Sequence, residues 1–124
     1  MDATVGTFEG AVIERSHDLP VVVVRPFNNY GPRQHPEKVV PRFITQALQG
    51  LPLTIHGEGR ASRDWLYVED HVRALRLAVE RGQPGRTYNI GGDNERRNID
   101  VVRQICALLD ERRPDGIPER CLAP

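Results

Sequence analysis

A polar segment, RPFNNYGPRQHPEK, directly follows a run of four valines at residues 21–24. Two adjacent amides, Asn28 and Asn29, stand where this apolar stretch gives way to a Tyr-Gly-Pro turn and a group of charges. Open α/β sheets hold their ligands at the carboxyl ends of the strands, so these amides are candidates for ligand binding. A polar turn is also the ordinary way for a buried strand to leave a core, and the segment alone leaves both interpretations open.

Glu69, Asp70 and His71 combine two carboxylates with an imidazole, the groups that general acid–base catalysis uses. Consecutive residues at the start of a helix point in different directions, so capping and solvation are favoured over catalysis. The four histidines show no spacing typical of metal ligands, and Cys106 and Cys121 form no CxxC pair. A metal site and a disulfide are therefore not expected.

Alternating strands and helices are expected to position these side chains. The β-branched run at residues 21–25 is typical of a strand that is covered on both faces of a parallel sheet. Residues 53–56 and Thr87–Ile90 read as further short strands, Gly57–Gly59 as a turn, and residues 65–68 as another short apolar stretch. The alternation indicates the α/β class.

Helical spacing of apolar residues predicts helices over residues 38–49, 71–81 and 98–112. Asp70 is expected to cap the second helix and Gly82 to end it. Residues 9–16 read as the end of an earlier helix, and residues 114–124 as a frayed tail. The first helix has Val39, Val40, Phe43, Ile44, Ala47 and Leu48 at helical spacing. The side chains expected to face inward in the second are Leu75, Ala78 and Val79, and the third has Val101, Val102, Ile105, Leu108 and Leu109 on one apolar face.

The composition is that of one small soluble domain. Of the 124 residues, 39% are hydrophobic and 27% are charged, and the 17 basic side chains balance the 17 acidic ones. This balance argues against nucleic acid or an anionic membrane as a partner. No apolar run approaches the length of a membrane span, and the N-terminus lacks the features of a signal peptide, so a cytoplasmic location is expected.

Three stretches in order carry a resemblance: RPFNNYGPRQHPEKVVPRF, LTIHGEGRASRDWLYVEDHVRAL and TYNIGGDNERRNIDVVRQICALLDE. Together they resemble the extended short-chain dehydrogenase/reductases, the NAD-dependent epimerase/dehydratase family, and within it the dehydratase group that acts on dTDP-glucose. The resemblance implies NAD as cofactor, a nucleotide-diphosphate sugar as substrate, and a homodimer for the intact enzyme. It also implies an incomplete Rossmann-like parallel sheet with parts of the small substrate-binding domain, interleaved over residues 1–113.

The family pattern implies a role for each matching position. It puts Asn28 beside the nicotinamide cofactor and Asn29 beside the substrate. Arg63 rather than Arg60 is expected to fork onto the substrate diphosphate. The remaining positions implied on the substrate side are Lys38, Val39, Thr54, Ile55, His56 and Asn98.

Several of these positions also have a purely structural interpretation. Lys38 is an ordinary exposed lysine at a helix start, Thr54 to His56 alternate like any edge strand, and Asn98 is a natural N-cap. Arg60 and Arg63 can each pair with an acidic neighbour, Glu58 or Asp64, instead of a phosphate. Asp64 and Trp65 read as a local ion pair and a core aromatic.

The sequence lacks two motifs of the family, the GxxGxxG turn that seats the dinucleotide and the Tyr-x-x-x-Lys pair that transfers protons. No catalytic residue is therefore assigned, and the chain is expected to be an interior or C-terminal fragment that is inactive by itself. The leading prediction is the nucleotide-sugar binding portion of an NAD-dependent 4,6-dehydratase, a lyase of deoxysugar biosynthesis. A portion of a nucleotide-sugar 4-epimerase and a non-catalytic remnant remain as alternatives.

Overall fold

A computed structural model describes residues 4–6 and 18–112 of the chain. These residues form two compact units that interleave along the sequence. Unit 1 takes its described residues from 1–31 and 64–94, and unit 2 from 32–63 and 95–124. Within the described parts, no helix is both long enough and apolar enough to cross a bilayer.

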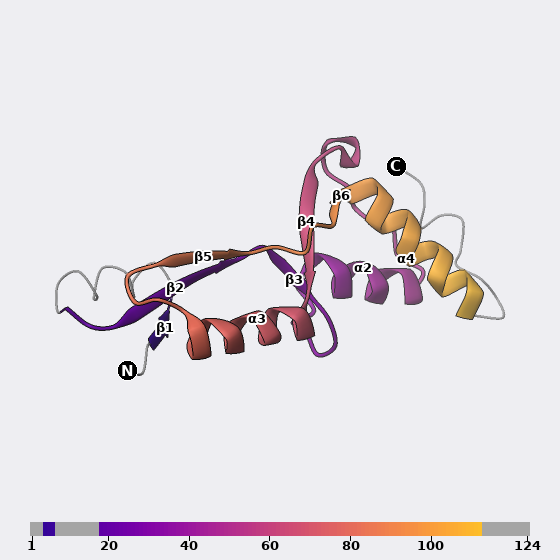
Figure 1. The fold of residues 1–124 in the computed structure, drawn as a ribbon. Coiled ribbons are helices and arrows are strands. Elements are labelled where there is room, and N and C mark those ends of the chain that lie inside the picture. Colours follow the sequence, from indigo (N-terminus) through magenta and orange to yellow (C-terminus); the bar gives the residue numbers. More distant parts are fainter. Residues whose placement is uncertain (1–3, 7–17, 113–124) are drawn as a thin grey trace. The chain divides into compact units, whose positions relative to one another are not determined.

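Unit 1 contains a parallel sheet in the order β1-β2-β5 (Figure 1). Its strands are β1 (Thr4–Gly6), β2 (Val21–Pro26) and β5 (Thr87–Ile90). Val21, Val22 and Val23 are all buried, as the unbroken valine run predicts for a strand covered on both faces. The predicted parallel α/β sheet is therefore confirmed.

Helix α3 (Val68–Arg81) packs against this sheet and ends at Gly82, as expected. It begins before residue 71, so the predicted capping role of Asp70 is wrong: Asp70 lies in the first turn and pairs with Arg73 at 3.0 Å. Ala78 faces inward and is 8% exposed, but Val79 is 53% exposed and not inward-facing. Successive helical residues are turned by about 100°, so both cannot face the sheet.

A second sheet has the order β3-β4-β6, formed by β3 (Asn28–Tyr30), β4 (Ser62–Tyr67) and β6 (Glu95–Arg97). Strand β4 begins earlier than the apolar stretch in the sequence suggests, because its first residues are polar and exposed. Strands β3 and β4 run parallel, with Asn28 opposite Trp65. Trp65 is buried and meets Tyr30 edge-on, which confirms it as a core aromatic.

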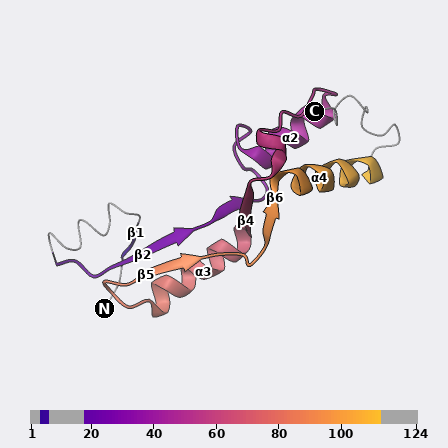
Figure 2. The ribbon, with the colours of Figure 1, turned by 90° about the horizontal axis from the view of Figure 1, so that it is seen from above.

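Unit 2 is built on two helices, α2 (Val39–Leu48) and α4 (Asn98–Arg112), which lie side by side in both ribbon views (Figure 2). Both helices match their predicted ranges. Gly50 ends the first with a φ of 68°, a conformation that favours glycine. The buried core of this unit is formed by Phe43, Ala47, Leu53, Val102, Ile105 and Cys106.

Two sequence predictions fail in unit 2. Residues 53–56 form no strand, because Leu53 is buried in the helical core and the segment pairs with no described strand. Leu108 is 46% exposed instead of facing inward, while its neighbour Leu109 packs against the core. The turn at Gly57–Gly59 is present as a short 3-10 helix, η1. The predicted segments 9–16 and 114–124 lie outside the described residues.

Candidate functional site

Three segments of unit 2 meet around Gly59. A Cβ atom placed on Gly59 would lie 2.7 Å from the Cβ of Ile99 and 2.9 Å from the Cγ2 of Ile55. The backbone N–H of Asn98 donates to the carbonyl oxygen of Ala61 at 2.9 Å. The segment containing Ile55, the turn after it and the start of α4 therefore converge, and two predicted positions, Ile55 and Asn98, belong to them.

Arg63 follows this turn on β4, and its side chain is exposed. Among the described residues it makes no ion pair. Arg60, by contrast, pairs with Glu58 at 2.6 Å, one of the two acidic partners that the sequence offers. Of the two arginines near the turn, Arg63 is thus the one whose guanidinium is free to bind an anion.

Asn98 is the first residue of α4 rather than its N-cap, so the predicted capping role is wrong. Its side-chain Oδ1 atom is buried and accepts no hydrogen bond from any described residue. A buried polar atom without a partner costs about 1–3 kcal/mol, and a ligand donor would remove that cost. Asn98 therefore stays a candidate for ligand binding.

A charged pair joins the end of β6 to the first turn of α4. The Arg97 Nε donates to Asp100 Oδ2 at 2.9 Å, and a second guanidinium nitrogen donates to Asp100 Oδ1 at 3.2 Å. These hydrogen bonds hold the pKa of Asp100 below its ordinary value, burial opposes them, and nearby arginine charges add to the lowering. The same hydrogen bonds raise the pKa of Arg97. The guanidinium of Arg97 is therefore already paired with a neighbouring carboxylate.

The other predicted residues of unit 2 lie on exposed surface. Lys38 precedes α2 and Val39 is its first residue. Thr54 and His56 are exposed on either side of the half-buried Ile55. All four are accessible to a ligand.

Asn28 and Asn29 belong to unit 1, where β3 holds them beside β4. The amide nitrogen of Asn29 donates to the carbonyl oxygen of Phe27 at 3.2 Å, which fixes the direction of that amide. The structure brings the two amides together on one short strand, while all other predicted residues lie in unit 2.

Asp64 is not the local ion pair that the sequence suggests. Its carboxylate accepts the backbone N–H of Gly92 at 2.9 Å and that of Asn94 at 2.8 Å. The sequence does hold a signal for this, because aspartate is disfavoured inside a strand and Asp64 lies within β4.

The acidic cluster at the start of α3 is surface structure. Arg73 pairs with Asp70 at 3.0 Å and with Glu69 at 4.0 Å, and these side chains are exposed. No group of described residues could hold a metal ion. The preference for solvation over catalysis stays a prediction for this cluster.

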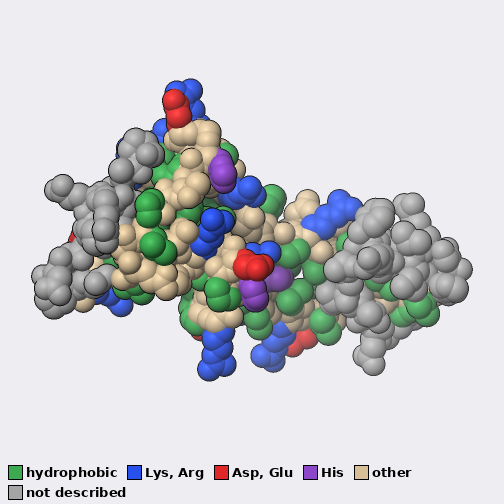
Figure 3. Space-filling view, turned by 180° about the vertical axis from the view of Figure 1, so that it is seen from behind, with side chains coloured by type: hydrophobic (Ala, Val, Ile, Leu, Met, Phe, Trp, Pro, Cys, Tyr) green, Lys and Arg blue, Asp and Glu red, His purple; other side chains and the backbone are tan. Residues whose placement is uncertain are grey.

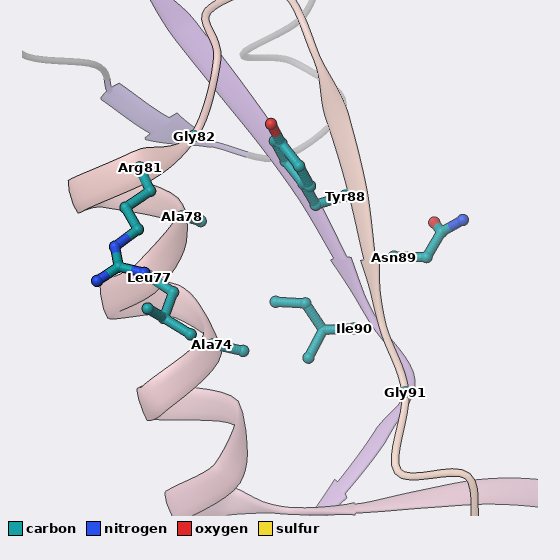
Figure 4. Close-up of a pocket in the computed structure, with 9 residues that line it drawn as sticks. All are labelled: Ala74, Leu77, Ala78, Arg81, Gly82, Tyr88, Asn89, Ile90 and Gly91. Atoms are coloured by element: carbon teal, nitrogen blue, oxygen red, sulfur yellow. The ribbon is translucent and has the colours of Figure 1, made fainter.

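On the face that Figure 3 shows, the described residues present both charged and apolar side chains. The exposed large hydrophobic residues include Phe27, Val72 and Leu77. Between α3 and β5 lies a hollow of about 480 Å³ in which Ile90 points toward the helix and Asn89 points away from it (Figure 4). Its lining contains none of the residues that the sequence predicts for ligand binding.

The sequence matches the NAD dependent epimerase/dehydratase family over residues 10–91, well over half of the chain. The chain belongs to this family. A curated epimerase/dehydratase relative, the dTDP-glucose 4,6-dehydratase of Escherichia coli, is 55% identical over 106 residues, covering 83% of the chain and 29% of the relative. The dTDP-glucose 4,6-dehydratase of Neisseria gonorrhoeae is 54% identical over 102 residues, with 82% and 30% covered. The chain thus spans about 30% of the length of these relatives.

Solved structures of the family resemble the fold. A dTDP-glucose 4,6-dehydratase from Bacillus anthracis, in complex with NAD, is 43% identical with a TM-score of 0.76, covering 89% of this chain and 35% of that one. A UDP-glucuronic acid 4-epimerase from Bacillus cereus, in complex with UDP-glucuronic acid and NAD, is 34% identical with a TM-score of 0.74, covering 79% and 32%. The Rossmann-like interpretation of the sheet is confirmed.

Gly91 and Gly92 of this epimerase/dehydratase chain pack closely against other parts of the chain. A Cβ atom on Gly92 would collide with the carbonyl oxygen of Trp65, and one on Gly91 would lie 2.7 Å from Asp64 Oδ2. Close packing against β4 therefore explains both glycines.

Proposed function

We propose that the chain supplies the substrate-nucleotide side of an NAD-dependent dTDP-glucose 4,6-dehydratase. The identity to dehydratases of several bacteria supports this reaction over 4-epimerisation. NAD, when bound in such an enzyme, accepts and returns a hydride. The residues of this chain bind and orient the nucleotide diphosphate of the sugar. The intact enzyme is a cytoplasmic homodimer in this proposal.

One observation carries the proposal: Arg63 has an exposed guanidinium and no ion-pair partner among the described residues. A guanidinium presents a planar fork of donors that fits two oxygens of a diphosphate. Asn98 supports the same site with an amide oxygen that is buried and without a described partner. In this proposal Arg63 binds the diphosphate and Asn98 accepts a hydrogen bond from the nucleotide sugar.

The proposal also gives a role to each of the other predicted residues. Lys38 and Val39 lie at the start of α2, where they would contact the substrate nucleotide. Thr54, Ile55 and His56 border the nucleoside in this proposal. Asn29 contacts the sugar and Asn28 the nicotinamide ring. A non-catalytic protein that only binds nucleotides remains the alternative, since this sequence contains no proton-transfer tyrosine motif.

Calorimetric titration of the chain with dTDP at low salt tests this proposal. Each charge-assisted hydrogen bond lost is worth about 1.5–3 kcal/mol, so Arg63→Ala should weaken binding about tenfold or more. Arg60→Ala is the matched control, because Arg60 already pairs with Glu58 and should have little effect. Equal losses at the two arginines, or tighter binding of NAD than of dTDP, would refute the proposal.

A further inference from the structure

Asp64 joins two segments that are far apart in the sequence. Its two carboxylate oxygens accept the backbone N–H groups of Gly92 and Asn94, which follow β5. The N–H of Trp65 donates back to the carbonyl oxygen of Asn94 at 3.2 Å. Three hydrogen bonds thus tie residues 64–65 of β4 to residues 92–94.

The packing at this junction leaves little freedom. Gly92 is pressed against the Trp65 carbonyl, where a Cβ would collide. A Cβ on Gly91 would lie 2.7 Å from Asp64 Oδ2 and 3.0 Å from the ring of Phe27. The chain can approach Asp64 this closely only because both residues are glycines.

Fixing Asp64 also fixes the direction of its neighbour. Successive side chains of a strand point to opposite faces, so Arg63 points away from the face on which Asp64 accepts its two bonds. A rotation or a one-residue slip of β4 would turn Arg63 toward the wrong face. It would also break the three hydrogen bonds at Asp64 and Trp65.

We propose that Asp64 is the positioning residue of the diphosphate site: its bonds to Gly92 and Asn94 hold β4 in the register that presents Arg63 to the ligand. This inference rests on the proposed function of Arg63. The two donated N–H groups occupy the carboxylate, so its negative charge is held in a local network on the face opposite Arg63. Asp64 itself touches neither substrate nor cofactor in this proposal.

The experiment compares Asp64→Asn with Asp93→Asn in the full chain. In Asp64→Asn one carboxylate oxygen becomes an NH2 group, which cannot accept the N–H that now faces it. Asp93 lies in the same turn, is exposed, and has a φ of 48°, which asparagine adopts readily. The control therefore removes one negative charge from the turn that Asp64 contacts, without touching the hydrogen bonds of Asp64.

Two measurements separate positioning from simple stability. The first is the ratio of affinities for dTDP and for thymidine, measured by chemical-shift titration, which isolates the gain from the diphosphate. The second, made without ligand, is the 15N relaxation of the Arg63 backbone amide. In Asp64→Asn the ratio should fall fivefold or more with thymidine binding unchanged, and the Arg63 amide should become more mobile. Asp93→Asn should match the original chain in both.

The outcomes distinguish the two proposals. If Asp64→Asn is less stable but keeps the affinity ratio and the order of the Arg63 amide, Asp64 is only structural and the inference is overturned. If the original chain itself shows no preference for dTDP over thymidine, the proposed function fails, and the relaxation of Arg63 still decides whether Asp64 fixes β4. Should Asp64→Asn not fold, Asp64→Glu, which keeps both acceptors but displaces them, should show a smaller loss in the same two measurements, and no loss overturns the inference.

Discussion

Gly59 and Ile99 lie so close together that a Cβ atom on Gly59 would stand 2.7 Å from the Cβ of Ile99. Gly59 also has a φ of 70°, in the left-handed region that favours glycine. It joins the turn of η1 to the start of α4, where the candidate ligand residue Asn98 lies. A substitution at Gly59 should therefore disturb both folding and the candidate site.

We expect Gly59→Ala to lower the free energy of unfolding by about 2–4 kcal/mol, since positive φ and overpacking each cost about 1–3 kcal/mol. Urea denaturation measures the change. Gly57→Ala is the matched control, because Gly57 has a φ of 59° but a Cβ there would meet nothing within 4 Å. Its cost should be about 1 kcal/mol, from the backbone alone. Equal costs at the two glycines would show that contact with Ile99 and Ile55 is unimportant.

The pairing of Arg97 with Asp100 predicts a pH dependence of stability. The folded pKa of Asp100 lies below the value of 3.8 for the free group. Between the two values the unfolded chain binds more protons, so the stabilisation is fully present above pH 3.8 and is lost as the pH falls through the folded pKa. Asp100→Asn should remove this contribution.

The measurement is the urea midpoint of the original chain and of Asp100→Asn from pH 7 down to pH 2. The difference between them should be constant above about pH 5 and should shrink below pH 3.8. Asp93→Asn serves as the control, because Asp93 lies on an exposed turn outside α4. A difference that stays unchanged down to pH 2 would contradict the role of Arg97.

The helices and strands with strong periodicity could be predicted from the sequence. The valine run gives β2, and apolar spacing gives α2 and α4 almost residue by residue. Residues 53–56 mislead, because their alternation resembles a strand although Leu53 is held by the helical core. Local pattern cannot tell which neighbour a short segment will find.

The candidate site was only partly predictable for a related reason. Arg63 is distinguished from Arg60 by the ion pair that Arg60 makes with Glu58. From the sequence, either arginine could pair with either Glu58 or Asp64. Asp64 acts through residues about thirty positions away, so no local pattern identifies its partners. Long-range hydrogen bonds have to be seen in the structure.

A polypeptide of these 124 residues should not convert dTDP-glucose. The sequence holds neither a GxxGxxG turn to seat a dinucleotide nor a Tyr-x-x-x-Lys pair to move protons. Incubation with dTDP-glucose and NAD, with detection of a 4-keto sugar, is the test. A 4-keto product that forms with this polypeptide, and does not form with its Arg63→Ala variant, would contradict the prediction. It would show that other residues of the polypeptide supply the proton transfer.

Strand β5 is an edge strand of the described sheet, whereas β2 has a neighbouring strand on each side. The carbonyl oxygen of Arg86 accepts the N–H of Val23 in β2, and that of Ile90 accepts the N–H of Phe27, directly after β2. Since successive residues of a strand point their backbone groups to opposite sides, Thr87 and Asn89 direct theirs away from β2. Such unpaired groups are a template for pairing with another chain.

We therefore expect the polypeptide to self-associate through β5, and Asn89→Pro to weaken that association. Proline removes one outward N–H group and is tolerated on an edge strand, so the fold should persist. Sedimentation velocity over a range of concentrations measures the association, and Asn89→Thr, which keeps the N–H, is the control. The original chain and the threonine variant should form dimers or larger species at concentrations where the proline variant is monomeric. A monomeric original chain at every concentration, or equal association of all three, would contradict pairing at this edge.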